Sequence, residues 1–236
     1  MSDELRHSSA HVFVELITAP ALNEVDEHHL TRVLRLRDGE TVTASDGRGQ
    51  WRSCTWRNGG LHATGEINAV PAPVGRCAVA FVPVKGDRAE WSVQKLTEIG
   101  VDEIVIVAPT QHSVVRWSDV DKQMQKLRTI AREAAMQSRR VWLPNVVGPS
   151  PLRDVCARNG AAIADPNGVA LTTIAPSASP AVSLVVIGPE GGFSDDELPT
   201  DIARVSLGDT ILRAETATLV AATLLVAART STAIGR

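Results

Sequence analysis

From residue 77 onward, short apolar runs alternate with segments of helical periodicity, and this alternation restricts the fold more than any other feature of the chain. The run Cys77–Val84 is followed by an amphipathic segment, Arg88–Ile99, which ends at Gly100. The same succession recurs towards the C-terminus. Chains of this kind form a mostly parallel sheet that helices cover on both faces. We therefore expect an α/β domain over residues 76–236.

The other elements expected in this domain follow the same two patterns. The expected strands are Glu103–Ala108, Ala161–Ala164, Val182–Ile187 and Val205–Leu207, and the expected helices are Asp119–Ser138, Leu152–Arg158 and Ala214–Ala228. The sequence Ser194-Asp195-Asp196-Glu197 is a capping box and predicts a further short helix. The longest uncharged apolar stretch, Thr216–Ala228, is shorter than the ~20 residues of a membrane-spanning helix. We expect a buried helix there and no membrane partner.

The first seventy residues follow a different pattern. Stretches in which apolar and polar residues alternate are separated by turn residues such as Asp38-Gly39 and Asn58-Gly59-Gly60. The expected strands are His11–Ile17, Glu40–Ser45, Gln50–Trp56 and Leu61–Ile67, with a short helix at Asp26–Leu36. Short strands joined by hairpin turns predict a compact β-barrel. We expect this domain to cover residues 1–70, followed by a Pro-containing linker over 71–75.

Composition excludes several classes of protein. Hydrophobic residues make up 44% of the chain and charged residues 22%, as in an ordinary globular protein. The net charge of −3 gives no overall basic field, so any RNA contact must come from local patches. The three cysteines stand far apart and without metal-ligand spacing, which predicts neither disulfides nor a metal site. The N-terminus is polar and has no signal-peptide pattern, so we expect a cytoplasmic protein.

Ligands of open parallel sheets bind beyond the carboxyl ends of strands. Two glycine-bearing loops follow the last two expected strands: Gly188–Ser194 and Gly208–Arg213. Glycine removes side chains where a ligand must touch the backbone, and such a loop can bind adenine through backbone N–H and C=O groups. A tight strand-to-helix turn would also explain glycines at these positions. The dinucleotide fingerprint and the phosphate-binding loop are both missing, which weighs against a nicotinamide- or ATP-dependent small-molecule enzyme.

Read together, the two loops resemble the cofactor-binding end of SPOUT methyltransferases. Within them the chain resembles the RsmE-type family, which methylates uridine on ring nitrogen 3 in small-subunit ribosomal RNA. The motifs that carry the resemblance are Lys85-Gly86-Asp87, Gln94–Val101, Glu133–Ser138, Gly188–Ser194, Leu207-Gly208 and Ile211–Ala217. In the N-terminal part, His28–Leu36 and Asp46-Gly47 resemble the PUA-like RNA-binding barrel of that family.

The resemblance implies a fold, a cofactor and partners. It implies a deep trefoil knot in the C-terminal domain, S-adenosylmethionine held there in a bent shape, and a homodimer formed through that domain. It also implies 16S ribosomal RNA, or the small ribosomal subunit, as the substrate. The residues implied to bind the cofactor are Gly188, Glu190, Gly191, Gly192, Leu207, Gly208, Ile211, Leu212 and Arg213.

Methylation of a uracil ring nitrogen requires that its proton leave, so a base or a group that stabilises the anion is expected. Arg213 is a candidate for stabilising negative charge on the uracil carbonyls, and Glu190 is a candidate proton acceptor. Glu98 is a second acid in a matching motif. An ion pair between Arg213 and Glu215 would explain the arginine equally well. Backbone N–H groups of the adjacent helix N-terminus could equally satisfy Glu190.

Two basic segments are candidate RNA surfaces. Between Lys122 and Trp142 the chain has a local excess of five positive charges. The RNA-binding candidates are Lys122, Lys126, Arg132, Arg139 and Arg140 in this segment, and Arg32 and Arg35 in the N-terminal domain. A solvated helix face would explain the first segment without RNA. The turn Gln111-His112-Ser113 departs from the acidic-Arg-Ser turn of the family, and Ser9-Ala10-His11 stand where it carries paired arginines.

Two other functions remain open from the sequence. A SPOUT enzyme of this kind could act on another RNA position, such as a ribose 2′-hydroxyl. A protein with the same RNA-binding surfaces could also assist ribosome assembly without catalysis.

Overall fold

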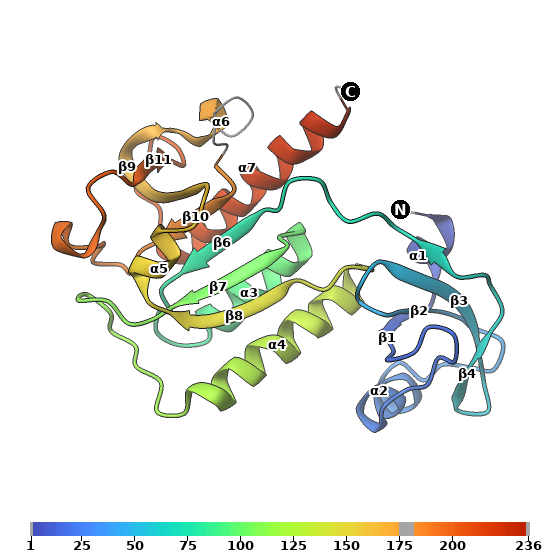
Figure 1. Ribbon diagram of the computed structural model, residues 1–236. Helices are drawn as coiled ribbons and strands as arrows, with labels where there is room; N and C mark the ends of the chain where they lie inside the picture. Colours follow the sequence, from blue (N-terminus) through green and yellow to red (C-terminus); the bar gives the residue numbers. More distant parts are fainter. Residues whose placement is uncertain (1, 175–181, 235–236) are drawn as a thin grey trace. The chain divides into compact units, whose positions relative to one another are not determined.

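The computed structural model describes residues 2–174 and 182–234, which form two compact units (Figure 1). The first unit combines Met1–Ala72 with Arg132–Leu143, and the second combines Pro73–Ala131 with Pro144–Arg236. The boundary between Ala72 and Pro73 lies inside the linker expected from the sequence. The segment Arg132–Leu143 was expected in the second domain, but its contacts place it in the first unit.

The first unit contains a mixed sheet, three short helical segments and the C-terminal end of a longer helix. Its elements are α1 (Asp3–His7), β1 (Ala10–Phe13), α2 (Glu24–His28), the π-helix η1 (His29–Val33), β2 (Thr41–Ser45), β3 (Gln50–Arg57), β4 (Gly60–Ala63) and β5 (Asn68–Ala69). The strands pair in the order β1-β2-β3-β4, and β5 also pairs with β3. Only β1 and β2 run parallel; the other pairs are antiparallel. The described pairings therefore follow an open path rather than a closed ring.

Three expected elements of this unit differ in the structure. The strand predicted at His11–Ile17 is shorter and lies at Ala10–Phe13. The helix predicted at Asp26–Leu36 is divided into α2 and the π-helix η1, and Arg35 follows with a left-handed φ of +54°. The strand predicted at Leu61–Ile67 ends at Ala63, because the next two backbone N–H groups both donate to the carbonyl of Ser53. A hydrophobic pattern alone does not specify this turn.

Buried His11 joins β1 to the segment Arg132–Leu143 inside the first unit. Its Nε2 lies 3.0 Å from the carbonyl oxygen of Arg140, and its Nδ1 lies 2.8 Å from the hydroxyl of Thr43. Burial lowers the pKa of His11 to about 4. The hydrogen bond to the Arg140 backbone has a smaller, opposite effect on this pKa, and the charge of Arg139 lowers it further. The imidazole is therefore neutral near pH 7. Because a carbonyl only accepts, Nε2 carries the proton.

The second unit is built on a six-stranded sheet in the order β11-β9-β10-β6-β7-β8, with every neighbouring pair parallel. The strands are β6 (Ala78–Phe81), β7 (Glu103–Val107), β8 (Asn145–Ser150), β9 (Ala161–Ala170), β10 (Leu184–Ile187) and β11 (Ala203–Ser206). The helices are α3 (Arg88–Ile99), α4 (Val120–Gln137), α5 (Leu152–Cys156), α6 (Leu171–Ile174), the 3₁₀-helix η2 (Asp195–Glu197) and α7 (Ala214–Ile234). Helix α4 passes from the second unit into the first at Arg132.

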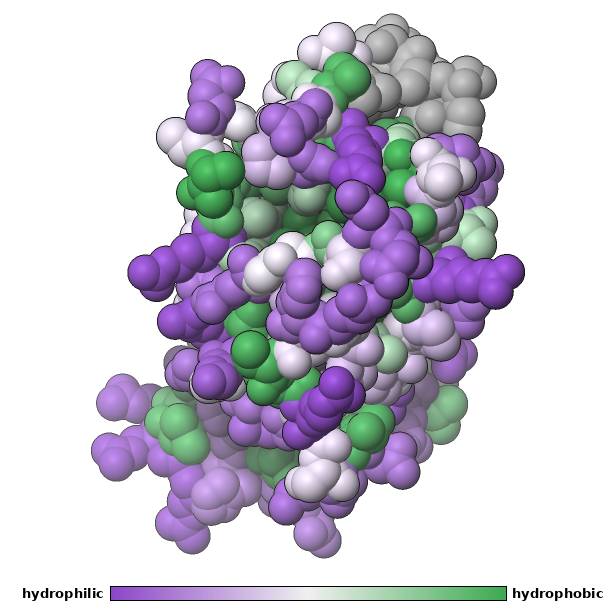
Figure 2. Space-filling model, turned by 90° about the vertical axis from the view of Figure 1, so that its left-hand side faces the viewer, coloured by the Kyte–Doolittle hydropathy of each residue, from purple (hydrophilic) through white to green (hydrophobic). Residues whose placement is uncertain are grey.

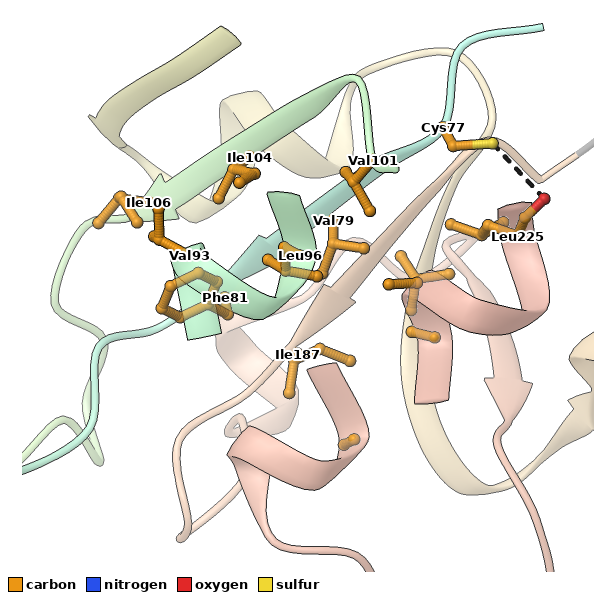
Figure 3. Packing of buried hydrophobic residues seen from close by; sticks show 14 of the residues in the cluster. Cys77, Val79, Phe81, Val93, Leu96, Val101, Ile104, Ile106, Ile187 and Leu225 are labelled. Atoms are coloured by element: carbon orange, nitrogen blue, oxygen red, sulfur yellow. Dashed lines mark hydrogen bonds between the residues drawn. The ribbon is translucent and has the colours of Figure 1, made fainter. Parts of the chain in front are cut away.

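Alternate residues of the central strands enter two separate cores, as expected for a parallel sheet covered on both faces. Val79 and Phe81 of β6 pack with α3, α4 and α7, and Figure 3 shows part of this cluster. Ala78 and Ala80 of the same strand pack on the opposite face with α5. Helix α3 ends at Gly100, whose φ of +107° suits glycine, as the sequence predicted.

Strand β8 was not among the strands expected from the sequence, and it contains Gly148-Pro149, a pair more typical of turns. Proline is tolerated in β8 because this strand lies at the edge of the sheet. The helices α1 and α6 were also not expected, since each is only about one turn long. Among the helices of the described ranges, none has the length and apolar character needed to cross a membrane.

Candidate cofactor site

A cavity of about 690 Å³ lies in the second unit, against the turns that follow β10 and β11. Its size falls within the range of small-molecule binding sites. Figure 2 shows the side on which β6, β7 and β8 end in Figure 1, with hydrophobic surface exposed between hydrophilic side chains. Ile211, which lines the cavity, is 81% exposed. The cavity therefore offers apolar surface that a ligand can cover.

A bulge in β9 forms another wall of this cavity. β11 pairs with β9 at Ile163 and then again at Val169, so residues 164–168 leave the regular ladder. Ala164, Asp165 and Pro166 line the cavity from this bulge. Gly168 is required at the return to the sheet, because a Cβ atom there would lie 2.5 Å from the backbone of Arg204.

The structure brings together both loops that the sequence singled out. Of the residues implied to bind the cofactor, those that line the cavity are Gly188, Glu190, Gly192, Leu207, Gly208, Ile211, Leu212 and Arg213. Gly192 and Gly208 have φ angles of +70° and +149°, which other residues rarely adopt. The two turns thus bend their backbone around one cavity.

Gly191 is the exception among the implied cofactor residues. It is not part of the cavity lining, and a Cβ atom on it would lie 3.0 Å from Cβ of His112. Gly191 therefore faces the loop that follows β7, and its contact with the cofactor stays a prediction of the resemblance. Its lack of a side chain allows that loop to approach.

The loop after β7 is hydrogen-bonded to the turn after β10. The backbone N–H of Gln111 donates to Oε1 of Glu197 at 2.7 Å, and the side-chain amide of Gln111 donates to the carboxylate of Asp196 at 2.9 Å. Nδ1 of His112 lies 3.2 Å from the carbonyl oxygen of Gly192 and donates to it. The predicted capping box is present, with Glu197 accepting from the backbone N–H of Ser194. These contacts hold the glycine turn in place.

An ion pair that the sequence did not reveal lies in the cavity wall. Asp165 of the β9 bulge accepts a hydrogen bond from Arg204 of β11 at 2.6 Å. This hydrogen bond, together with one from the backbone N–H of Asn167, holds the pKa of Asp165 below its usual value. Asp165 is therefore ionised near pH 7. No local motif marks this pair, because only the bulge brings the two residues together.

Arg88, at the start of α3, connects the two loops. Its Nη1 lies 3.0 Å from Oε1 of Glu190 and 3.6 Å from Oε1 of Glu215. Neither sequence alternative for these residues holds: Glu215 pairs with Arg88 rather than with Arg213, and Glu190 pairs with Arg88 rather than with backbone N–H groups. Glu98 binds Lys95 and is not part of the cavity lining.

Arg213 keeps an exposed side chain at the cavity, and within the described ranges it takes part in no ion pair. A guanidinium without a carboxylate partner is suited to bind an anionic or electron-rich group of a ligand. In the described part of the chain, no cluster of His, Cys, Asp or Glu could hold a metal ion.

The basic residues predicted to contact RNA separate into two groups. Arg132 and Arg139 hold the first unit together: Arg132 pairs with buried Asp26, and Arg139 donates to the carbonyl of Ser8 at 2.8 Å. Burial lowers the pKa of Arg139. Both side chains are engaged within the protein, which gives them a structural role, and their contact with RNA stays a prediction.

The other candidates present more of their side chains to solvent. Lys122, Arg32 and Arg35 are exposed. Lys126 is exposed and pairs with Glu90 at 2.6 Å. Arg140 is half-buried, and its carbonyl accepts the hydrogen bond of His11.

The cavity has the donors, acceptors and apolar walls that a nucleoside-type cofactor requires. Leu207, Ile211 and Leu212 offer apolar surface for a flat base, while the backbone of the glycine turns remains accessible beside it. Asp165 and Glu190 supply carboxylates for hydroxyl or cationic groups. The sequence anticipated the apolar and glycine positions but not Asp165, Arg204 or Arg88.

The fold and this site define the class of RNA methyltransferases. Residues 70–226 match the family described as RNA methyltransferase domain, and residues 26–55 match the RNA methyltransferase PUA domain. More narrowly, the chain belongs to the ribosomal RNA small subunit methyltransferase E family, the RsmE-type family that its motifs resemble.

Relatives and solved structures support this membership. The ribosomal RNA small subunit methyltransferase E of Mycobacterium bovis is 33% identical over 86% of this chain and 84% of its own length. The protein of that name from Synechocystis sp. is 32% identical over 82% of this chain and 68% of its own. A methyltransferase from Legionella pneumophila, solved with the bound cofactor SAM, is 25% identical and has a TM-score of 0.80, over 92% of this chain and 97% of its own.

Proposed function

We propose that this protein transfers a methyl group from S-adenosylmethionine to ring nitrogen 3 of a uridine in 16S ribosomal RNA of the small subunit. One observation carries the proposal: the turns after β10 and β11 line a single cavity of about 690 Å³. Family membership supports the choice of substrate, because curated relatives are named for the small-subunit ribosomal RNA. The SAM-bound Legionella structure supports the choice of cofactor.

The residues of the cavity fit this cofactor. We assign the adenine to the apolar surface of Leu207, Ile211 and Leu212, with the backbone of Gly188 and Gly208 beside its polar edge. When bound, the cofactor supplies a methyl group that is already activated, so the protein must chiefly align it with the ring nitrogen.

Two side chains at the cavity suit the deprotonation of uracil. Arg213 stabilises negative charge on the uracil carbonyls, because no carboxylate of the described chain occupies its guanidinium. Glu190 accepts the proton from ring nitrogen 3. Its side chain is 59% exposed and is therefore accessible to an entering base.

RNA contacts in this proposal come from exposed basic residues of both units. Arg32 and Arg35 belong to the first unit, and both lie in the stretch that matches the PUA domain family. Lys122 and Lys126 belong to the second unit. Contacts from these side chains to phosphates would bind RNA without selecting its sequence and would weaken with salt.

The family resemblance also supports four finer features of the proposal. The first unit is a PUA-like barrel that its described strand pairings leave partly open, and the C-terminal part of the second unit is knotted. In support of the knot, α7 packs against α3 and β6 although it directly follows β11 at the sheet edge. The protein acts as a homodimer through the second unit, where exposed Ile211 provides apolar surface. It works in the cytoplasm, where its ribosomal substrate is assembled.

The decisive experiment compares nucleosides of small-subunit ribosomal RNA from cells with and without the protein, by mass spectrometry. We expect N3-methyluridine to disappear in the absence of the protein and to return with the wild-type chain. Loss of a ribose-methylated nucleoside instead would identify another RNA position. An unchanged nucleoside profile, together with RNA binding but no S-adenosylmethionine binding in calorimetry, would favour a non-catalytic role in ribosome assembly.

A further inference from the structure

Six charged side chains stand at or beside the cofactor cavity, and their pairing is uneven. Asp165 pairs with Arg204, whose guanidinium also lies 4.0 Å from the exposed carboxylate of Asp195, while Arg213 stands apart. The remaining cation, Arg88, lies between two carboxylates, Glu190 and Glu215. One guanidinium therefore compensates two acids, one in the turn after β10 and the other in the first turn of α7.

Glu215 is the less accessible of the two acids. Its side chain is 15% exposed, against 59% for Glu190. Its second oxygen, Oε2, is buried and has no hydrogen-bond partner, and among the described residues no other buried side-chain oxygen or nitrogen is left in this state. A buried carboxylate oxygen without a donor is costly, so proteins keep such groups mainly where another interaction requires them.

The positions of these residues suggest what that interaction is. Glu190 lies in the turn after β10, and Glu215 lies in the first turn of α7, directly after the second turn of the site. Arg88 at the start of α3 is the only residue that bridges them in the described chain, and both Arg88 and Glu190 line the cavity. The spacing of the two turns therefore depends on Arg88.

We propose that Arg88 and Glu215 are a positioning pair for the cofactor: Arg88 ties the turn after β10 to the start of α7, and the mostly buried Glu215 fixes the guanidinium that does so. The proposal rests on the function proposed above. Neither residue acts on the reacting atoms. Their effect reaches the cofactor through the distance between Gly188 and Leu212, which stand in the two turns.

The test measures S-adenosylmethionine binding to the full-length protein by calorimetry. We expect Arg88→Ala to weaken affinity about tenfold, in the usual range for a coupled charge pair reduced by partial solvent exposure. Arg158→Ala is a matched control, because Arg158 is 38% exposed like Arg88 and pairs with a mostly buried acid, Glu103, that does not line the cavity. The control should lower the melting temperature comparably but keep wild-type affinity.

Glu215→Gln and the double variant complete the experiment. Glu215→Gln preserves shape, and it should weaken cofactor binding and raise KM for S-adenosylmethionine more than it lowers kcat. Arg88→Ala combined with Glu215→Gln should be no weaker than the worse single variant. If the wild-type chain binds the cofactor and both single variants match it, the positioning pair is wrong. If the wild-type chain does not bind it, the proposed function itself fails and this pair with it. If Arg88→Ala does not fold, Glu215→Gln decides.

Discussion

Replacing Arg132 tests whether this residue holds the first unit together or binds RNA. Asp26 is 3% exposed, and the guanidinium of Arg132 donates to both of its carboxylate oxygens, at 2.9 and 2.5 Å, and to the carbonyl of Phe13 at 3.1 Å. Arg132→Met removes these donors and leaves a buried carboxylate with the amide of Asn23, at 2.9 Å, as its remaining side-chain partner.

The magnitude follows from the burial of the pair. Removing one partner of a buried ion pair costs roughly 3–5 kcal/mol. We expect the lower end, about 3 kcal/mol, because Asn23 remains and the side chain of Arg132 is 28% exposed. With an m-value of about 2 kcal/mol/M, the urea midpoint of the first unit falls by about 1.5 M. The buried Trp51 and Trp56 report this transition by fluorescence.

Two further variants test whether Arg132 stabilises the first unit. Combining Asp26→Asn with Arg132→Met removes the uncompensated charge and should recover part of the lost stability. Lys122→Ala, on the same helix, removes an exposed lysine and should change stability by less than about 0.5 kcal/mol. It should also weaken RNA binding in low salt. An Arg132→Met chain that unfolds at the wild-type urea concentration and loses RNA affinity would show that the structural role is wrong.

Three further predictions concern protonation and the cavity. His11 has a pKa near 6.5 in the unfolded chain and near 4 in the folded chain, so the free energy of unfolding should fall as the pH decreases from 6.5 to 4. The loss should reach up to about 3 kcal/mol. A His11→Asn variant should lose less stability over the same pH range, as measured by urea unfolding. Gly188→Val should weaken S-adenosylmethionine binding at least about tenfold, because a Cβ added at Gly188 would lie 3.1 Å from the ring of Phe193 in the cavity wall. Gly191→Val should weaken binding less, because Gly191 does not line the cavity. Equal losses of affinity in calorimetry would contradict this placement of the two glycines. Asp165→Asn should weaken S-adenosylmethionine binding, and the affinity should not change between pH 6 and 8 in either the variant or the wild type, because the Asp165 carboxyl is ionised throughout this range. A wild-type affinity that changes with pH, together with a constant affinity in the variant, would contradict the lowered pKa.

Local sequence patterns were sufficient to predict the elements that are determined by residues close to one another in the sequence. The helix α3 has the predicted bounds because its apolar face and its terminal glycine both lie in the same short stretch. The strand cores of β6, β7 and β10 were found for a similar reason, since strands buried on both faces are apolar throughout. The glycine turns were found because strand ends of parallel sheets meet at one edge.

Features that depend on distant partners could not be predicted from the sequence. Asp165 and Arg204 meet only because β9 bulges, and Arg88 reaches Glu215 only because α7 packs against α3. The charge of Arg132 looks the same in the sequence whether it faces solvent or Asp26. The short reach of each pattern thus explains why apolar cofactor residues were found and their charged neighbours were not.

Because the first unit takes in Arg132–Leu143, its folding is tied to the timing of synthesis. Domains usually fold in order as they leave the ribosome. Here the N-terminal sheet emerges early, yet Ser45 and His11 find their acceptors on Val141 and Arg140 only after another seventy residues have been translated. By then β6, β7 and α3 are also outside the exit tunnel. During synthesis, residues 1–72 therefore stay incompletely packed while strands of the second unit are already exposed beside them.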